Sequence, residues 1–299
     1  MTDQSVLITG STGLMGQFLL KRMEQNKIEG KINCFVRSTS NTAHIQDLNL
    51  AIEKWIGDCT EEKSWLKIVE STQPDTIIHI ASIRYVPCIL HALSETKQKP
   101  RLIIIGTTGV YSQYNQYSAE YKHIENQLKQ YSGSLCLLRP TMIYGSHLDK
   151  NLHKLIKFCD RYQFFPVFGS GQSLLQPVHA DDLAQAIMSV FLNPKIEGAY
   201  DLSGGTVITF LELLALVEKL LGKTVHPLRV PYNLGLWSAT LSEKILGTRS
   251  PVRREQILRL QEDKAYSHEV ARRDFGYNPR SLEVGLTQEI EILRSEGII

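Results

Sequence analysis

The residues whose spacing most clearly supports chemistry lie in the octapeptide Thr9–Gly16, which reads TGSTGLMG. Each glycine meets a separate physical need. Gly10 permits a tight turn, Gly13 allows the backbone to approach a ligand closely, and Gly16 lets a following helix pack against the preceding strand. Bare amides at the positive end of such a helix bind phosphates. The pattern therefore predicts a diphosphate site lined by Gly10, Thr12, Gly13, Leu14, Met15 and Gly16.

A basic residue follows the next apolar run. Arg37 lies 21 residues after Gly16, where an acidic residue would accept hydrogen bonds from the ribose 2′-hydroxyl of NAD. An arginine there pairs instead with the 2′-phosphate of NADP, although a solvated arginine at a strand end is the structural alternative. Asp58 and Cys59 follow the third apolar run, and we expect them to lie beside the adenine. An ordinary turn would also explain an aspartate at position 58. We therefore predict NADP as the cofactor, with NAD less favoured.

Short apolar runs alternate with amphipathic stretches through the first half of the chain. The predicted strands are 5–9, 31–36, 51–56, 76–80, 102–105 and 135–138, and the predicted helices are 14–25, 64–70, 87–97 and 117–130. Continuous apolar strands separated by helices are typical of a parallel sheet covered on both faces. Right-handed crossovers then give a doubly wound α/β fold of the Rossmann type.

After Gly145 the pattern becomes mainly helical. Helices are expected at 151–162, 181–192, 210–221, 232–246, 253–260 and 282–297, with a short strand at 199–202 and an irregular loop at Phe164–Gly171. We predict a Rossmann domain made of residues 1–145 and 174–203. A smaller, mostly helical substrate domain would contain residues 146–173 and 204–299.

Composition limits the partners and the compartment. The 299 residues are 42% hydrophobic and carry a formal net charge of +2 without a long block of like charge, which gives no electrostatic case for nucleic acid or an anionic membrane. No apolar run reaches about 18 residues and no secretory leader is evident. The five cysteines show no CxxC spacing and the nine histidines no HExxH pattern, so we predict a reducing, cytoplasmic location and no metal site.

Several motifs recur in order along the chain. They are Thr9–Gly16, Asp75–Ala81 (DTIIHIA), Thr107–Tyr111 (TTGVY), Leu138–Gly145 (LRPTMIYG), Pro177–Ala184 (PVHADDLA) and Arg273–Pro279 (RDFGYNP). Together they resemble the extended short-chain dehydrogenase/reductases, the NAD-dependent epimerase/dehydratase family. The resemblance implies an NAD(P) domain, a substrate domain, and a small-molecule substrate that is often a nucleotide sugar. It also implies a homodimer, for which no exposed stripe locates an interface.

In that family the chemistry uses a hydroxyl residue, a tyrosine, and a lysine four residues after the tyrosine. Thr107 matches the hydroxyl position, and Tyr117 matches the tyrosine that exchanges a proton with the substrate oxygen. The lysine position holds Tyr121, and Lys122 points about 140° away from Tyr117 around the helix. The resemblance places three further residues near the nicotinamide: Ala81, Pro140 and Thr141.

The incomplete pair leaves two functions open. One is an NADP-dependent oxidoreductase or epimerase-like enzyme acting on a carbonyl or hydroxyl of a small polar metabolite, with Tyr117 as acid or base. The other is a non-catalytic NADP-binding regulator or assembly factor, since a shared fold does not establish an activity. Tyr117, Tyr121, Ile124 and Leu128 also recur at the spacing of a core-facing stripe, which packing alone would explain.

A few other residues have both a functional and a structural interpretation. Arg84 suits an anionic substrate group or simple solvation, and the loop Gly169–Gln172 lies where family members contact substrate. His79 lies inside an apolar strand and is expected to be a core histidine with satisfied hydrogen bonds. Asp181 or Asp182 is expected to cap the helix that follows.

Overall fold

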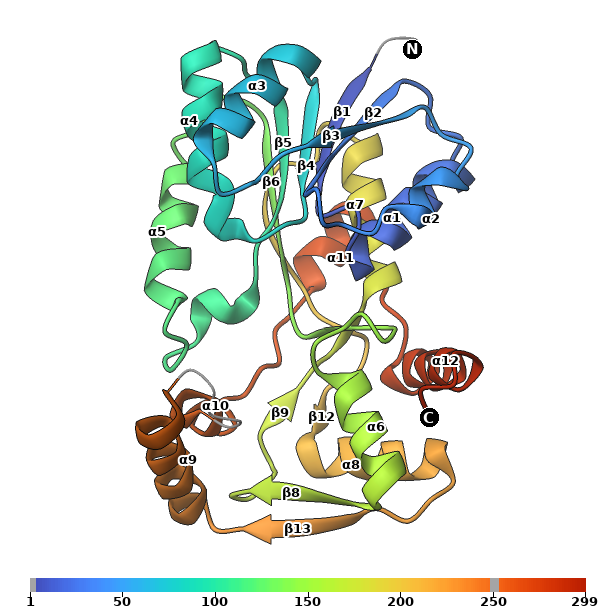
Figure 1. Ribbon diagram of the computed structural model, residues 1–299, viewed down its shortest axis with the longest axis vertical. Coiled ribbons are helices and arrows are strands. Elements are labelled where there is room, and N and C mark those ends of the chain that lie inside the picture. The colour runs from blue at the N-terminus through green and yellow to red at the C-terminus, as the bar shows by residue number, and fades with distance from the viewer. Residues whose placement is uncertain (1–3, 248–252) are drawn as a thin grey trace.

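A computed structural model describes residues 4–247 and 253–299, and its centre is a parallel sheet (Figure 1). The seven strands run in the order β11-β6-β5-β4-β1-β2-β3, and each neighbouring pair is parallel. They are β1 (Ser5–Thr9), β2 (Lys31–Val36), β3 (Ile52–Ile56), β4 (Thr76–His79), β5 (Arg101–Ile105), β6 (Leu135–Pro140) and β11 (Gly198–Leu202). The strand order reverses between β1 and β4, as in a doubly wound Rossmann sheet. The predicted fold class is confirmed.

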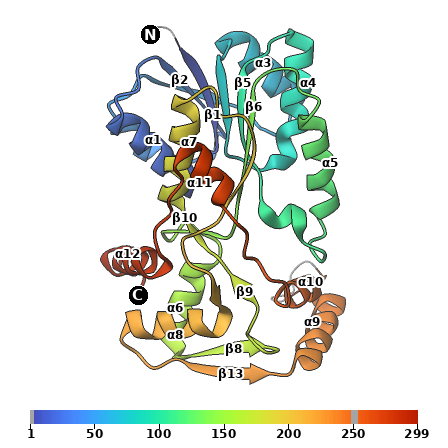
Figure 2. The same cartoon turned by 180° about the vertical axis from the view of Figure 1, so that it is seen from behind.

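Helices cover both faces of the sheet (Figures 1 and 2). One layer holds α1 (Leu14–Gln25), α7 (Ala180–Leu192) and α11 (Glu269–Phe275), and the other holds α3 (Glu62–Thr72), α4 (Val86–Thr96) and α5 (Ser118–Leu128). Strand side chains alternate between the layers, so Val6 and Ile8 join the first core while Leu7 joins the second. Because both faces are buried, the central strands are largely apolar, and the sequence predicts them well.

A smaller region lies beneath the sheet in Figure 1. Its core is formed mainly by α6 (Leu152–Tyr162), α8 (Phe210–Leu221) and α12 (Leu282–Ser295). Two helices, α9 (Tyr232–Leu246) and α10 (Arg254–Arg259), lie at one corner of this region. Its short strands are β7 (Ile143–Tyr144), β8 (Phe164–Phe168), β9 (Leu174–Leu175), β10 (Val178–His179), β12 (Ile208–Thr209) and β13 (His226–Val230).

The expectation of an irregular loop at Phe164–Gly171 is wrong for its first five residues. They form β8, which pairs in parallel with β13. A proline at position 166 argues against an interior strand, but β8 has one partner in its two-stranded sheet, so the missing amide can face the open edge. Phe165 packs on Phe158 and Phe210 and thereby secures the strand to α6 and α8.

The start of α7 also differs from the expectation. His179 caps the helix, because its Nδ1 accepts the amide of Asp181 at 3.2 Å. The carboxylates predicted as caps bind arginines instead. Asp181 pairs with Arg22 at 2.6 Å and with Arg280 at 2.7 Å, while Asp182 pairs with Arg280 at 2.8 Å. These pairs fasten the segment before α12 to α7 and α1.

A buried pair of carboxyl groups joins α6 to α12. Glu289 is fully buried, and both of its oxygens lack a donor among the described residues. Its neighbour is Asp149, whose buried carboxylate also accepts the amides of Asn151 and His153 at the start of α6. Burial and the adjacent Asp149 raise the pKa of Glu289 to about 10. Glu289 is therefore protonated at neutral pH, and its proton can be donated to Asp149.

This pair predicts a pH dependence of stability. Because the folded-state pKa of Glu289 lies above the ordinary 4.5, its contribution is complete below that value and is lost as pH rises through about 10. Thermal unfolding followed by circular dichroism should show the wild-type midpoint falling between about pH 6 and 10, and a Glu289→Gln variant should flatten that fall. Glu283→Gln, an exposed change on the same helix, is the control. Parallel curves for wild type and Glu289→Gln would contradict this assignment.

Candidate functional site

The glycine turn lies where β1 passes into α1, beside the end of β4. Gly10 has a φ of +72°, and a Cβ there would lie 2.9 Å from the amide nitrogen of Ala81. A Cβ on Gly16 would lie 2.2 Å from the carbonyl oxygen of Gly10. The Gly13 amide donates to that same carbonyl at 3.1 Å. Two of the three glycines are therefore required by the packing of the turn itself.

The N-terminus of α1 is open to a ligand. Within residues 4–247 and 253–299, no side chain caps this helix at Gly13, and its first turn carries no acidic residue. Apart from its chain neighbours, a Cβ on Gly13 would meet only the Gly10 oxygen within 4 Å, at 3.4 Å, so the space directly beside Gly13 is free. Thr12, Leu14 and Met15 complete the turn. Free amides at a positive helix end fit a diphosphate.

A chain of hydrogen bonds holds the end of β4 against this turn. The buried His79 contacts Thr9 Oγ1 through Nδ1 at 2.8 Å and the Ser82 carbonyl through Nε2 at 2.9 Å. Burial lowers the pKa of His79 to about 4, so the ring is neutral. Since a carbonyl can only accept, Nε2 carries the hydrogen and Nδ1 accepts from Thr9. Thr9 Oγ1 in turn accepts the amide of Ala81 at 3.3 Å. His79 is thus the satisfied core histidine that its position predicts.

The residues predicted for the adenosine end lie at the ends of β2 and β3. Arg37 follows β2 and is exposed. Asp58 Oδ1 accepts the amide and the hydroxyl of Thr60, both at 2.8 Å, and these bonds lower the pKa of Asp58, with a smaller contribution from Arg37. The Cys59 carbonyl accepts Trp65 Nε1 at 3.0 Å. The turn therefore occupies one oxygen of Asp58, and Arg37 interacts with this carboxylate through its charge.

Three residues predicted near the substrate and nicotinamide have structural partners. Thr107 Oγ1 accepts the Gly109 amide at 3.0 Å, which leaves its own hydroxyl hydrogen free to donate elsewhere. The Pro140 carbonyl accepts Thr108 Oγ1 at 3.3 Å. Thr141 is buried, and its hydroxyl donates to the Gln176 carbonyl at 2.5 Å. Of the three side chains, that of Thr107 retains the clearest capacity to bind a ligand.

Tyr117 lies at the start of α5 with 36% of its side chain exposed. The guanidinium of Arg84 lies 4.5 Å from its ring centroid and also pairs with Glu120 at 2.8 Å. Tyr121 follows one turn later with its ring 6.3 Å away, and Lys122 is exposed. The structure thus places an arginine on Tyr117, and Arg84 has an acidic partner instead of being free for an anionic substrate.

A polar network that sequence reasoning missed lies between β6, β11 and α5. Arg139 binds Glu125 through two bonds of 2.8 and 2.7 Å and lies 3.5 Å from Asp201. The Tyr111 hydroxyl donates to Asp201 at 3.0 Å, and burial, followed by the charge of Asp201, raises the pKa of Tyr111 to about 12. Tyr111 and Arg139 stand in motifs of the family resemblance, so the signal was present, but Asp201 has no motif of its own.

A second missed contact ties the far end of the chain to the loop before Tyr117. Glu262 accepts the hydroxyl of Ser112 and the amide of Gln113, both at 2.7 Å. Nearby, the ring of Tyr266 lies 5.3 Å from that of Tyr111. A segment more than a hundred residues away in sequence thus fixes the short loop that precedes α5, and no local pattern could reveal this.

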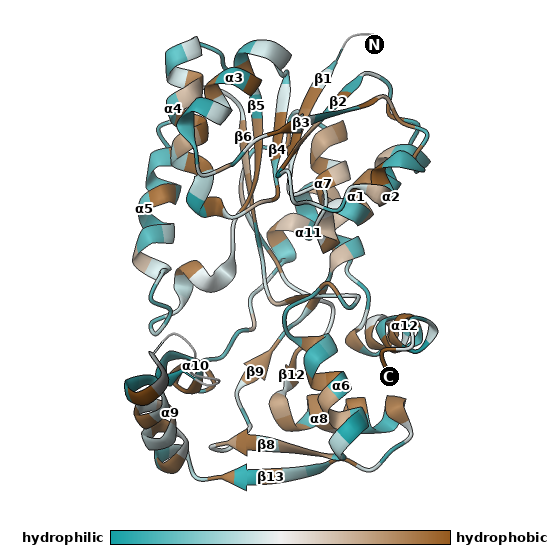
Figure 3. Ribbon diagram, viewed as in Figure 1, coloured by the Kyte–Doolittle hydropathy of each residue, from teal (hydrophilic) through white to brown (hydrophobic). Residues whose placement is uncertain are grey.

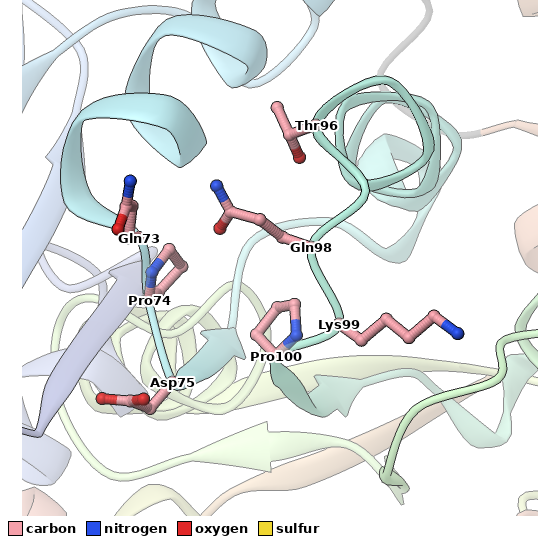
Figure 4. Close-up of a pocket in the computed structure, with 7 residues that line it drawn as sticks. All are labelled: Gln73, Pro74, Asp75, Thr96, Gln98, Lys99 and Pro100. Atoms are coloured by element: carbon pink, nitrogen blue, oxygen red, sulfur yellow. The ribbon is translucent and has the colours of Figure 1, made fainter.

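A surface pocket lies at the opposite edge of the sheet, at the amino ends of β4 and β5 (Figure 4). It is lined by Gln73, Pro74, Asp75, Thr96, Gln98, Lys99 and Pro100. Ligands of open α/β sheets bind at the carboxyl ends of the strands, so this pocket is not the candidate site. Among the described residues there is no metal-binding group of three or more His, Cys, Asp or Glu side chains, and no helix suited to crossing a membrane.

A seven-stranded parallel sheet with an uncapped glycine turn at its switch point defines a Rossmann-type dinucleotide fold. Residues 6–88 match the sequence model of the NAD dependent epimerase/dehydratase family. The resemblance predicted from the motifs is thereby confirmed.

Known proteins extend this match. The mouse short-chain dehydrogenase/reductase family 42E member 1 is 25% identical over 185 residues, covering 56% of this chain and 46% of that protein. A Dictyostelium discoideum mitochondrial protein, NADH dehydrogenase [ubiquinone] 1 alpha subcomplex subunit 9, is 33% identical over 82 residues, or 27% of this chain and 22% of that one. The matches thus span less than half of these relatives.

One similar solved structure is the Bifidobacterium longum UDP-glucose 4-epimerase in complex with NAD+ and UDP. It has a TM-score of 0.75 and 17% identity, with 98% of this chain and 99% of that chain covered. The likeness shows that the two chains share a fold along nearly their whole lengths.

The glycine turn predicts that two alanine substitutions both weaken nucleotide binding but differ in their effect on stability. A Gly16→Ala Cβ would collide with backbone at 2.2 and 2.6 Å, so we expect a lower unfolding temperature as well as lost nucleotide binding. Gly13→Ala has room in the protein but intrudes where a diphosphate approaches, so we expect a near-normal unfolding temperature and at least about tenfold weaker binding. Thermal unfolding and fluorescence titration with NADPH measure both. Undiminished affinity in Gly13→Ala would contradict the assignment.

Proposed function

We propose that this protein binds NADP across the glycine turn, with the diphosphate on α1 and the adenosine end over β2 and β3. The uncapped start of α1 is the observation that carries the proposal. Arg37 is exposed at the end of β2, where the chain offers no acidic partner for a ribose 2′-hydroxyl. The proposed contacts come from Gly10, Thr12, Gly13, Leu14, Met15, Gly16, Arg37, Asp58, Cys59, Ala81, Pro140 and Thr141.

The cofactor preference can be tested at Arg37. Replacing this residue by glutamate removes the partner of a 2′-phosphate and adds repulsion, so Arg37→Glu should lower the NADPH-to-NADH affinity ratio at least about tenfold. Isothermal titration with both nucleotides measures the ratio. Arg272→Glu, a charge change at an exposed site on α11, is the matched control. An unchanged NADPH-to-NADH affinity ratio in Arg37→Glu would contradict the assignment of NADP as the cofactor.

We further propose that the protein is an oxidoreductase or epimerase-like enzyme acting on a carbonyl or hydroxyl of a small polar metabolite. Nucleotide sugars are the class to try first, because a structural neighbour is a UDP-glucose 4-epimerase. Bound nicotinamide supplies or accepts the hydride. Thr107 would donate its free hydroxyl hydrogen to the substrate oxygen, and Tyr117 would transfer a proton to it.

The surroundings of Tyr117 favour the reductive direction. Tyr121 stands where the family places a lysine, so no ammonium follows Tyr117 by one helical turn. A neutral phenol donates a proton more readily than it removes one at neutral pH. Arg84, 4.5 Å from the ring, would stabilise the phenolate left behind, although its pairing with Glu120 offsets part of that charge.

A second function is favoured by specific observations. Tyr121 occupies the lysine position of the catalytic pair, and a stretch of 82 residues is 33% identical to a protein named as a subunit of NADH dehydrogenase [ubiquinone]. The alternative is therefore an NADP-binding regulator or assembly factor without turnover. Three predictions from the sequence stay predictions: the homodimer, the cytoplasmic location, and the division into two domains. The domains would contain residues 1–145 and 174–203 in one case and 146–173 and 204–299 in the other.

Substitution of the tyrosine separates the two functions. Under the enzyme proposal, Tyr117→Phe should lower NADPH-dependent turnover of carbonyl compounds or nucleotide sugars at least about tenfold while nucleotide affinity stays unchanged. Tyr114→Phe, an exposed tyrosine in the preceding loop, is the control. Intact NADPH binding without turnover across a broad substrate panel would favour the regulator. An unchanged turnover rate in Tyr117→Phe would exclude this residue as the acid.

A further inference from the structure

Helix α9 exposes a row of large apolar side chains. They are Leu234 (53% exposed), Trp237 (64%), Leu241 (41%) and Ile245 (71%). Their spacing of three, four and four residues places them on one face of the helix. The opposite face packs on the protein: Ala239 is buried, and Gly235 lies directly against the ring of Phe168. We call the four exposed residues the α9 stripe.

The stripe reverses the usual polarity of a surface helix. A helix on a globular protein buries its apolar face and exposes its polar one, and a contiguous exposed apolar face marks an interaction site. Both ribbon views place α9 at a corner of the molecule, away from the central sheet (Figures 1 and 2). Brown, apolar bands run along its outer ribbon in Figure 3.

Basic residues outnumber acidic ones in the segment that contains the stripe. Between Leu228 and Arg254 the sequence has five basic residues and one acidic residue, an excess of four in a chain whose total is +2. Four of these basic residues are described and exposed: Arg229, Lys244, Arg253 and Arg254. Lys244 lies on α9 beside the stripe, and α10 with Arg254 packs on α9. Glu243 lies within this segment, and Glu255, Glu262 and Asp263 follow it.

We propose that α9 binds the surface of an anionic lipid bilayer, with the stripe in the headgroup region and the neighbouring cations on lipid phosphates. An apolar face bearing tryptophan, leucine and isoleucine, bordered by lysine and arginine, is the pattern of an interfacial helix. At 15 residues, α9 is too short to span a bilayer and lies along it instead. The binding is independent of the proposed nucleotide site, which is on the other region of the molecule.

The same charges disfavour a second copy of this chain as the occupant. A contact between two α9 stripes would bring together two segments that each carry an excess of positive charge, which costs energy. One row of side chains on one short helix also offers less area than a stable dimer needs. The net charge of the whole chain does not reveal this basic segment, because the residues outside it carry a net negative charge.

The test uses the full chain and sonicated vesicles of phosphatidylcholine, alone or with about one third phosphatidylglycerol. Co-sedimentation should show at least about tenfold stronger partition to the anionic vesicles, weakened by salt. Trp237 reports the contact directly, because Trp65 is fully buried and Trp55 partly buried. Its fluorescence should shift to shorter wavelength on anionic vesicles.

Variants on exposed positions leave the core intact. Trp237→Gln combined with Ile245→Gln should reduce vesicle partition at least about tenfold, and Lys244→Glu should reduce it selectively on anionic vesicles. Ile56→Gln, at an apolar position on β3 that is 74% exposed, should have no effect. Far-ultraviolet circular dichroism and a cooperative thermal unfolding transition check that each variant is folded.

Three outcomes would overturn the proposal. One is no sedimentation with anionic vesicles, and another is equal binding by wild type and the double variant. The third is a dimer in light scattering that the double variant abolishes while vesicle binding is absent. In that last case the stripe would be an interface between copies of this chain.

Discussion

The close approach of α1 to β1 at Gly10 and Gly16 is the constraint on which the rest of the structure depends. With 2.2 Å between an added Cβ at position 16 and the Gly10 oxygen, only glycine allows the helix to start there. That contact directs the first amides of α1 toward the switch point of the sheet. The hydrogen-bonded chain from His79 through Thr9 to Ala81 then holds β4 beside the turn. Close packing and these hydrogen bonds together fix a turn at the positive end of a helix dipole.

The smaller region is attached to this cradle by charge as well as by apolar contact. Arg280 joins the segment before α12 to the start of α7, and Glu262 holds the loop before α5. These two attachments bring the distal half of the chain to the carboxyl edge of the sheet, beside Tyr111 and Tyr117. The chemistry proposed there follows from what surrounds the phenols. Tyr117, the proposed acid, has the guanidinium of Arg84 on its ring and no lysine at the helical spacing that would favour a base.

The sequence predicts the inner strands of the sheet closely because they are buried on both faces and contain continuous apolar runs, as in Leu102–Ile105. The glycine turn is equally predictable from the sequence, because the glycines lie between a predicted strand and a predicted helix. Prediction failed where a residue's state depends on distant chain. Phe164–Phe168 becomes a strand only because β13 arrives some sixty residues later. The periodicity of α9 predicts an apolar face, but it does not predict whether that face points to the core or to solvent, because tertiary packing decides this. The role of Tyr117 also cannot be decided from the sequence. A catalytic tyrosine and a core-packing tyrosine can both occur at the three- and four-residue spacing of a helix face.

Saturable binding of a pyridine nucleotide at the start of α1 is the central claim. Isothermal titration of the purified full chain with NADPH and, separately, with NADH tests it most directly. A single saturable binding event, tighter for NADPH, is the predicted result. Absence of a saturable signal with both nucleotides, in protein that unfolds cooperatively, would contradict the account and leave the glycine turn as a packing feature only.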